Sequence, residues 1–163
     1  RSGNDATTYI PTDEDLLEGF RKSKLTNLQT KGILYLIESY IRPANSATLL
    51  LGFNGYSLEH LMPKNWQKNW PACSSDELAQ QRDSKLLTLG NLAIIPQALN
   101  ASIRDGDWAT KKSGKGIDKP GLEACAKGLA TLSTVLSEAE WTEEKIDARA
   151  KWLFEIAETL WKI

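Results

Sequence analysis

The chain has 163 residues, of which 41% are hydrophobic and 25% charged, and its formal net charge is −1 at pH 7. This is an ordinary length and composition for one globular domain, and no apolar run approaches the roughly 20 residues that cross a bilayer, so we expect no membrane partner. The near-neutral charge excludes the strongly basic class of nucleic-acid binders. We therefore predict a single domain over residues 1–163.

The N-terminal sequence and the cysteines bear on the larger protein and the cellular compartment to which such a domain would belong. The sequence begins RSGND, without an initiator Met or a secretory pattern, so we expect the C-terminal fragment of a larger protein. Cys73 and Cys125 have neither CxxC nor Cys/His spacing, which predicts unpaired thiols rather than a disulfide framework or a zinc site. A cytoplasmic location fits this cysteine usage best.

Helical patterns dominate the first third of the chain. Thr12 followed by three acidic residues predicts a short helix. Apolar positions at three- and four-residue steps predict a second helix from Thr26 until Pro43 ends the pattern. The aliphatic and aromatic segment 49–58, which contains an Asn-Gly turn signal, predicts a short strand that leads into residues 56–59.

The middle of the chain reads as a loop followed by strands. Residues 64–85 predict a loop that carries one short helix. The apolar segment 86–96 predicts a local hairpin, a strand pair that turns near Gly90 and Asn91. Helical residues are expected to follow from about Gln97.

The last third again predicts helices. Beyond a Gly/Lys loop at 113–119, Pro120 opens a predicted helix that runs to about Ser133. Thr142 caps a last helix that reaches Trp161. The predicted fold class is therefore α+β and mostly helical, with helices surrounding a small hairpin that a helix follows at once.

His60 is the only histidine, and it follows the predicted strand in the segment EHLMP at 59–63. A lone histidine is most simply a packed or surface residue, but here an acidic residue precedes it and Asn91 and Asn100 lie downstream. Phosphodiester hydrolysis needs a base of near-neutral pKa and a hard divalent cation. His60 could supply the base, and Glu59 and Asn100 the oxygen ligands that Mg²⁺ prefers.

Four segments resemble the HNH, or ββα-metal, nucleases, and more closely the C-terminal nuclease domain of GmrSD-type modification-dependent restriction enzymes. They are YSLEHLMP at 56–63, LGNL at 89–92, LNAS at 99–102 and WATKK at 108–112. The nine-residue step from Asn91 to Asn100 also matches the HNH domain of RNA-guided CRISPR nucleases. The resemblance covers roughly residues 28–112 and implies a ββα-metal motif core at about 56–112.

The resemblance also implies roles for single residues. It implies His60 as the general base, Asn91 as the residue that braces the hairpin around it, and Glu59 and Asn100 as metal ligands. The expected ion is Mg²⁺, with Mn²⁺ and Ni²⁺ as alternatives.

DNA contacts are expected in the basic stretch 104–119, from Arg104, Lys111 and Lys112. Lys111 falls where the family usually has a Lys. The sequence departs from the family at Asp105, where Asn is usual, and at Lys64, where Gln is usual.

The sequence thus predicts a divalent-metal-dependent endonuclease domain that nicks or cuts DNA in a restriction or phage-defence system. By resemblance, its partner would be an N-terminal nucleotide-hydrolysing sensor domain of the same protein. Two alternatives stay open. One is a non-catalytic helical domain that binds DNA or protein, in which the motif residues only satisfy turns and caps. The other is an HNH-fold RNase or nonspecific DNase.

The tryptophans carry a weaker prediction. Trp141, Trp152 and Trp161 lie on or beside the last predicted helix at core-like spacing, so we expect them to pack in the core. Trp66 and Trp70 follow the EHLMP segment, where flanking the site and covering the hairpin are equally good interpretations.

Overall fold

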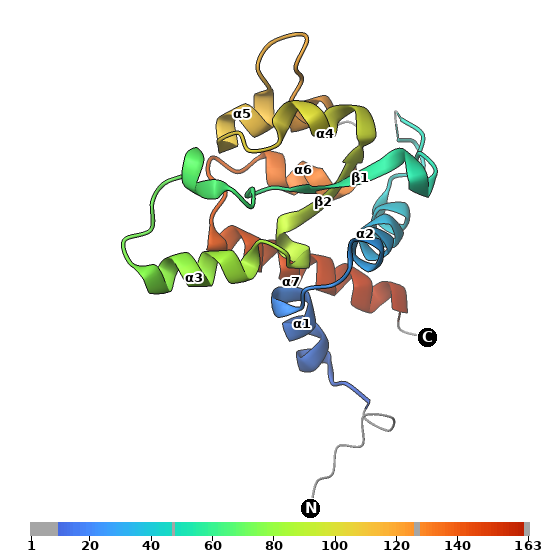
Figure 1. Cartoon of the computed structure of the whole chain (residues 1–163). Coiled ribbons are helices and arrows are strands. Elements are labelled where there is room, and N and C mark those ends of the chain that lie inside the picture. The colour runs from blue at the N-terminus through green and yellow to red at the C-terminus, as the bar shows by residue number, and fades with distance from the viewer. Residues whose placement is uncertain (1–9, 47, 126–127, 162–163) are drawn as a thin grey trace, which may run out of the picture.

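A small antiparallel sheet lies within a mostly helical molecule (Figure 1). The computed structural model describes residues 10–46, 48–125 and 128–161. In these ranges the sheet consists of β1 (Tyr56–His60) and β2 (Leu92–Pro96). The predicted α+β, mostly helical class is confirmed.

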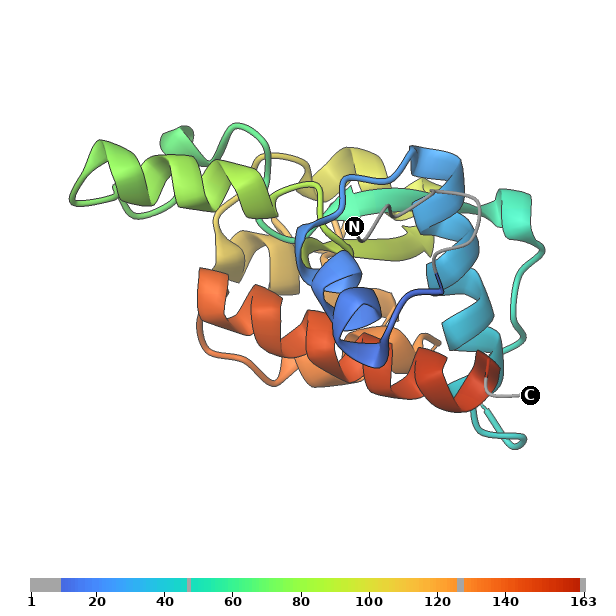
Figure 2. The ribbon, with the colours of Figure 1, turned by 90° about the horizontal axis from the view of Figure 1, so that it is seen from below.

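The helices cover the sheet from several sides. In chain order they are α1 (Asp13–Lys22), α2 (Asn27–Ile41), α3 (Asp76–Lys85), α4 (Gln97–Ile103), α5 (Trp108–Ser113), α6 (Ala130–Leu136) and α7 (Glu143–Trp161). Helix α4 packs on both strands, α2 packs against β2, and α7 runs along the turn that precedes β2. Seen from below, α1 crosses α7 (Figure 2). No helix in the described ranges is both long and apolar enough to cross a membrane.

Local signals explain the helix boundaries that were predicted well. Thr12 and Thr26 each form a capping box, in which the threonine side chain accepts from a backbone N–H of the first turn and a polar side chain bonds back. Ser75 caps α3 in the same region where a short helix was expected. These predictions are confirmed, as are those for α4 and α7.

The predicted local hairpin in segment 86–96 is wrong. Only Leu92–Pro96 form a strand, and they pair with β1, with His60 opposite Leu92. The expected turn exists as a 3₁₀ turn at Leu89–Asn91, but it packs on α7 instead of joining two strands. Four consecutive residues of β2 are buried, which explains the unbroken apolar run.

Two further boundaries also differ. The strand expected in 49–58 begins only at Tyr56, after a 3₁₀ turn, and extends to His60. The helix expected from Pro120 to Ser133 is wrong, since a short 3₁₀ turn comes first and α6 begins at Ala130. The cause is distant in sequence, because the buried Glu38 carboxylate accepts from the first backbone N–H groups of α6.

Gly90 is where the turn and α7 come closest. A Cβ atom at Gly90 would lie 2.1 Å from the Ile146 carbonyl oxygen, whereas a Cβ at Gly32 in α2 would meet nothing within 4 Å. We predict that Gly90→Ala lowers the free energy of unfolding by about 1–3 kcal/mol through overpacking. The matched change Gly32→Ala should raise it by roughly 0.5–1 kcal/mol, because alanine favours helix. Urea unfolding of both variants checks this, and equal effects would contradict the packing described.

Candidate active site

His60 ends β1, and its side chain is half-buried. The Nε2 atom is buried and has no hydrogen-bond partner among the residues that the structure describes. Burial is the main reason that the pKa of the imidazole falls from 6.5 to about 4, and the positive charges of Lys64 and Lys111 lower it further. His60 is therefore a neutral imidazole at pH 7 with one nitrogen unpaired.

Glu59 and Lys111 form a buried ion pair next to this histidine. Glu59 is 4% exposed and Lys111 is fully buried. The Lys111 ammonium donates to Oε1 of Glu59, and it also donates to the His60 carbonyl oxygen at 2.6 Å. Burial raises the pKa of Glu59 and lowers the pKa of Lys111, while each charge opposes the shift of the other. Through this ammonium, α5 is anchored to the end of β1.

Asn91 holds the loop that follows His60. Its side chain is fully buried, and its amide nitrogen donates to the carbonyl oxygens of Met62 at 2.8 Å and Leu86 at 3.0 Å. Its amide oxygen accepts from the Met62 N–H at 2.8 Å and from Trp141 Nε1 at 3.1 Å. Both backbone polar groups of Met62 are thus satisfied by one side chain. This is the set of contacts that the expected bracing role requires.

Arg149 supports the same turn from α7. Its Nη1 atom donates to the carbonyl oxygens of Leu89 at 3.2 Å, Gly90 at 3.0 Å and Leu92 at 2.7 Å. Those three residues flank Asn91 on both sides. Arg149 carries no signal of burial in the sequence, because it is one of several charged residues on an amphipathic helix.

The expected DNA contacts differ in how exposed they are. Arg104 is exposed and lies close enough to affect the pKa of Glu59. Lys112 is half-buried, donates to the Glu138 carbonyl oxygen at 3.0 Å and lies over the Trp108 ring. Lys111, expected to contact phosphate, has no exposed surface in this structure. Buried pairing with Glu59 is the physical reason, and it assigns Lys111 an internal role instead.

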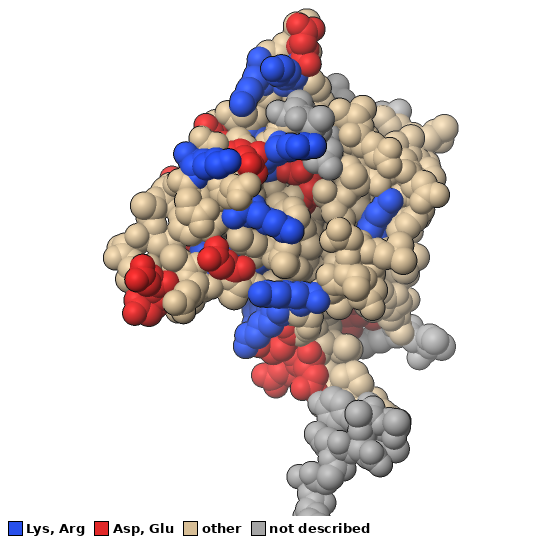
Figure 3. Space-filling view, in the orientation of Figure 1, with Lys and Arg blue, Asp and Glu red and all other residues tan. Residues whose placement is uncertain are grey.

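Two surface loops meet beside His60. Asn65 donates to the Asp105 carboxylate at 3.1 Å, and Asn69 donates to the Asp105 carbonyl oxygen at 2.6 Å. Lys64, the residue that departs from the family pattern, is exposed in the first of these loops. Figure 3 shows Lys and Arg side chains intermixed with Asp and Glu over one face of the molecule. The positive charges on this face are therefore not gathered into one continuous basic patch.

Trp66 and Trp70, whose role the sequence leaves undecided, lie beneath these loops. Trp66 and Trp70 are 5% and 8% exposed, and their indole N–H groups donate to the Asp83 carboxylate and the Gly106 carbonyl oxygen.

The packing expectation for the other tryptophans holds in part. Trp141 is buried, Trp152 is half-buried, and Trp161 is 46% exposed. The prediction for Trp161 holds only in part, because its ring packs against Phe20 of the core, with ring centroids 6.4 Å apart, while the rest of the side chain faces solvent.

Of the two predicted metal ligands, the structure describes the side chain of Glu59. The described residues contain no group of three or more His, Cys, Asp or Glu side chains arranged to hold one. Asn100 lies on α4, but its side chain falls outside the described part of the structure. Lys111 bonds one oxygen of Glu59, and a carboxylate has a second. That donor set fits Mg²⁺, which can be held by one or two carboxylates together with substrate phosphate and water.

Comparison with known families defines the class of protein. A family model of the C-terminal domain of GmrSD restriction endonucleases matches residues 10–156, from before α1 through most of α7. The protein is therefore a domain of the restriction-endonuclease class of nucleases. More specifically, the chain belongs to the GmrSD C-terminal domain family, and the match extends well beyond the expected range of 28–112. A comparison with curated proteins found no match.

The buried ion pair generates a stability prediction. Lys111→Met should lower the free energy of unfolding by about 3–5 kcal/mol, because it leaves the Glu59 carboxylate buried and unpaired. Adding Glu59→Leu to this variant should restore much of the loss, since apolar replacement of a whole buried pair is often neutral.

The exposed Lys115 provides the control, because Lys115→Met should change the free energy of unfolding by less than about 0.5 kcal/mol. Urea unfolding of the four proteins gives the comparison. A Lys111→Met protein as stable as the control would show that the pair is not buried in solution.

Proposed function

We propose that this domain hydrolyses DNA phosphodiester bonds in an HNH-type, divalent-metal-dependent reaction, with His60 as the general base. The unpaired, buried Nε2 atom of His60 carries the proposal, because the neighbouring Asn91 amide and Lys111 ammonium already have partners. A neutral imidazole can accept a proton from an attacking water molecule. The low pKa keeps His60 in this form at neutral pH, although it also makes the imidazole a weaker base than one of near-neutral pKa.

The surrounding residues act by holding that imidazole in place. Lys111 fixes the His60 carbonyl oxygen, and Asn91 fixes both backbone groups of Met62 two residues later. Positioning of this kind accounts for much of the rate advantage of a preorganised base. Glu59 and Asn100 are the proposed ligands of Mg²⁺, with Mn²⁺ or Ni²⁺ as alternatives, and the bound ion would neutralise charge that grows on the phosphate.

We further propose that the domain serves a restriction or phage-defence system in the cytoplasm. An N-terminal nucleotide-hydrolysing sensor domain of the same protein would select the target. The net charge of −1 supports a division of labour of this kind, since the domain itself then needs only a few phosphate contacts.

A non-catalytic interaction domain is the second candidate. Glu59 and Asn91 are engaged in structural hydrogen bonds, as that alternative requires. The unpaired Nε2 atom of His60 argues against it, because a buried polar atom without a partner costs about 1–3 kcal/mol and a purely structural role gives no reason to keep it unpaired.

The catalytic proposal predicts that His60→Ala reduces cutting of supercoiled plasmid by about 10²- to 10⁴-fold, the usual loss for a general base. The melting temperature should change little, because the side chain is only half-buried. Nicked and linear products are measured with Mg²⁺, Mn²⁺, Ni²⁺ and a chelator, and with RNA as a second substrate to test the RNase alternative.

Wild-type protein that cuts nothing with any of these ions would favour the interaction domain. Cutting by His60→Ala at the wild-type rate would remove His60 as the base, and this chain has no second histidine to replace it.

Phosphate contacts can be tested separately by the salt dependence of DNA binding, in the His60→Ala background so that nothing is cut. Arg104→Ala and Lys64→Ala should each reduce the slope of log K against log salt by up to about 0.9. Lys111 is buried, so the double variant Lys111→Met and Glu59→Leu, which keeps most of the stability and the net charge, should leave the slope unchanged. Lys151→Ala on α7 is the exposed control. Unchanged slopes for both Arg104 and Lys64 would place the DNA path elsewhere.

A further inference from the structure

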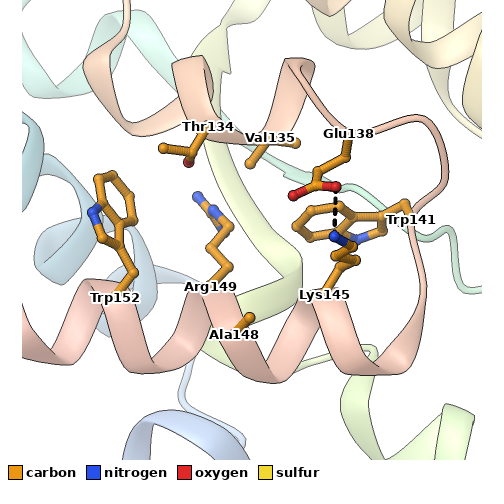
Figure 4. A pocket seen from close by; sticks show the side chains of 8 residues that line it. All are labelled: Thr134, Val135, Glu138, Trp141, Lys145, Ala148, Arg149 and Trp152. Carbon is orange, nitrogen blue, oxygen red and sulfur yellow. Dashed lines mark ion pairs between the residues drawn. The ribbon is translucent and has the colours of Figure 1, made fainter.

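A cavity of about 220 Å³ lies between α6 and α7 (Figure 4). It is lined by Thr134, Val135, Glu138, Trp141, Lys145, Ala148, Arg149 and Trp152. Figure 4 shows the Arg149 side chain rising from α7 toward α6, between the two indole rings. The cavity is thus built around one buried cation with aromatic walls.

Arg149 is poorly satisfied at this position. It is 4% exposed, and its Nη1 atom makes all three of its hydrogen bonds. The Nε and Nη2 atoms are buried and have no partner among the residues that the structure describes. Lys145 and Glu138 in the lining pair with each other at 2.7 Å, so the charge of Arg149 is the unbalanced one.

An uncompensated cation in such a place needs an explanation. Removing a guanidinium from water costs several kcal/mol unless a counter-charge or hydrogen-bond acceptors replace the water. An unsatisfied buried polar group in a native structure calls for an explanation, such as a bound water or ion. The two unpartnered nitrogens are covered in this structure, so a partner in the adjoining cavity would reach them once the side chains that cover them shift.

We propose that this cavity is a binding site for a small organic oxyanion, a carboxylate or phosphate carried on a flat apolar body. Guanidinium groups pair with both oxyanions through two N–H groups at once. Trp141, Trp152 and Val135 supply the apolar walls for the body. The volume is below the roughly 300–1,000 Å³ of sites for drug-sized ligands, so the ligand is a small one.

The site is connected to the turn behind His60. Arg149 bonds the backbone on both sides of Asn91, and Trp141 bonds the Asn91 side chain. A ligand between these two walls would therefore stabilise the turn directly. Any effect of the ligand on DNA cutting rests on the proposed function, whereas binding itself does not.

The test titrates the purified chain with benzoate and phenyl phosphate at constant ionic strength, with neutral benzamide as the matched control. Melting temperature and tryptophan fluorescence are followed, without DNA or metal. At about ten times Kd, a bound oxyanion should raise the melting temperature by roughly 3–6 °C. The stronger of the two anions identifies the preferred group, and an equal response to benzamide would overturn the proposal.

Variants at Thr134 keep the test independent of folding. Thr134 is exposed on α6 and lines the cavity, so Glu and Gln should both be tolerated there. Thr134→Glu brings a carboxylate toward Arg149, and it should raise the melting temperature and abolish the response to benzoate. Thr134→Gln, equal in size but neutral, should not raise it. Equal melting temperatures for the two variants, or a benzoate response that survives in Thr134→Glu, would show that Arg149 needs no anion.

Discussion

The buried side chain of Asn91 is the contact on which the rest of the site depends. The chain leaves β1 at His60 and enters the interior, where the backbone groups of Met62 cannot reach water. Groups of this kind must be paired inside the protein, and one amide side chain satisfies both of them. The same amide bonds Leu86 and Trp141, so three segments distant in sequence meet at one residue. The position of His60 is therefore set by the interior as much as by its strand.

A second constraint comes from the charges placed inside. The Lys111 ammonium neutralises Glu59 and also bonds the backbone of His60, so the carboxylate next to the proposed base is held whether or not an ion is bound. Buried pairs of this kind add little to stability compared with apolar packing, but they specify geometry because each partner has few alternatives. A metal ion at Glu59 would share the carboxylate with Lys111. That sharing distinguishes this site from a cage built only of metal ligands.

The elements that could be predicted from the sequence are those with local causes. Capping boxes at Thr12 and Thr26 mark the starts of α1 and α2 within the local sequence. The apolar periodicity of α2 and α7 indicates how far these two helices extend. The start of α6 could not be predicted, because its N-terminal N–H groups bond a carboxylate in α2. The local hairpin failed for the same reason, since the partner of β2 lies on the far side of a long connection.

The candidate site could likewise be predicted only in part from the sequence. The motif pattern located His60, Glu59 and Asn91, whose side chains the structure places at the end of β1 and in the turn that precedes β2. It could not reveal that Lys111 is buried, because a lysine in a basic segment has the same local pattern whether it faces solvent or a carboxylate. The burial of Arg149 has no local signal either. Both side chains are recognised only once the elements that surround them are in place.

These internal charges bear on how the domain would meet DNA. Lys111 is paired with Glu59, and Arg149 points inward toward backbone carbonyl oxygens. Neither side chain therefore adds to the surface potential. Lys64 and Arg104 are exposed cations whose charges act on His60 and Glu59, and Asp105 bonds Asn65 of the loop that carries Lys64. Because affinity for DNA grows with the number of phosphates neutralised, a surface of this kind favours weak binding by the isolated domain. The proposal that another part of the protein selects the target agrees with such weak binding.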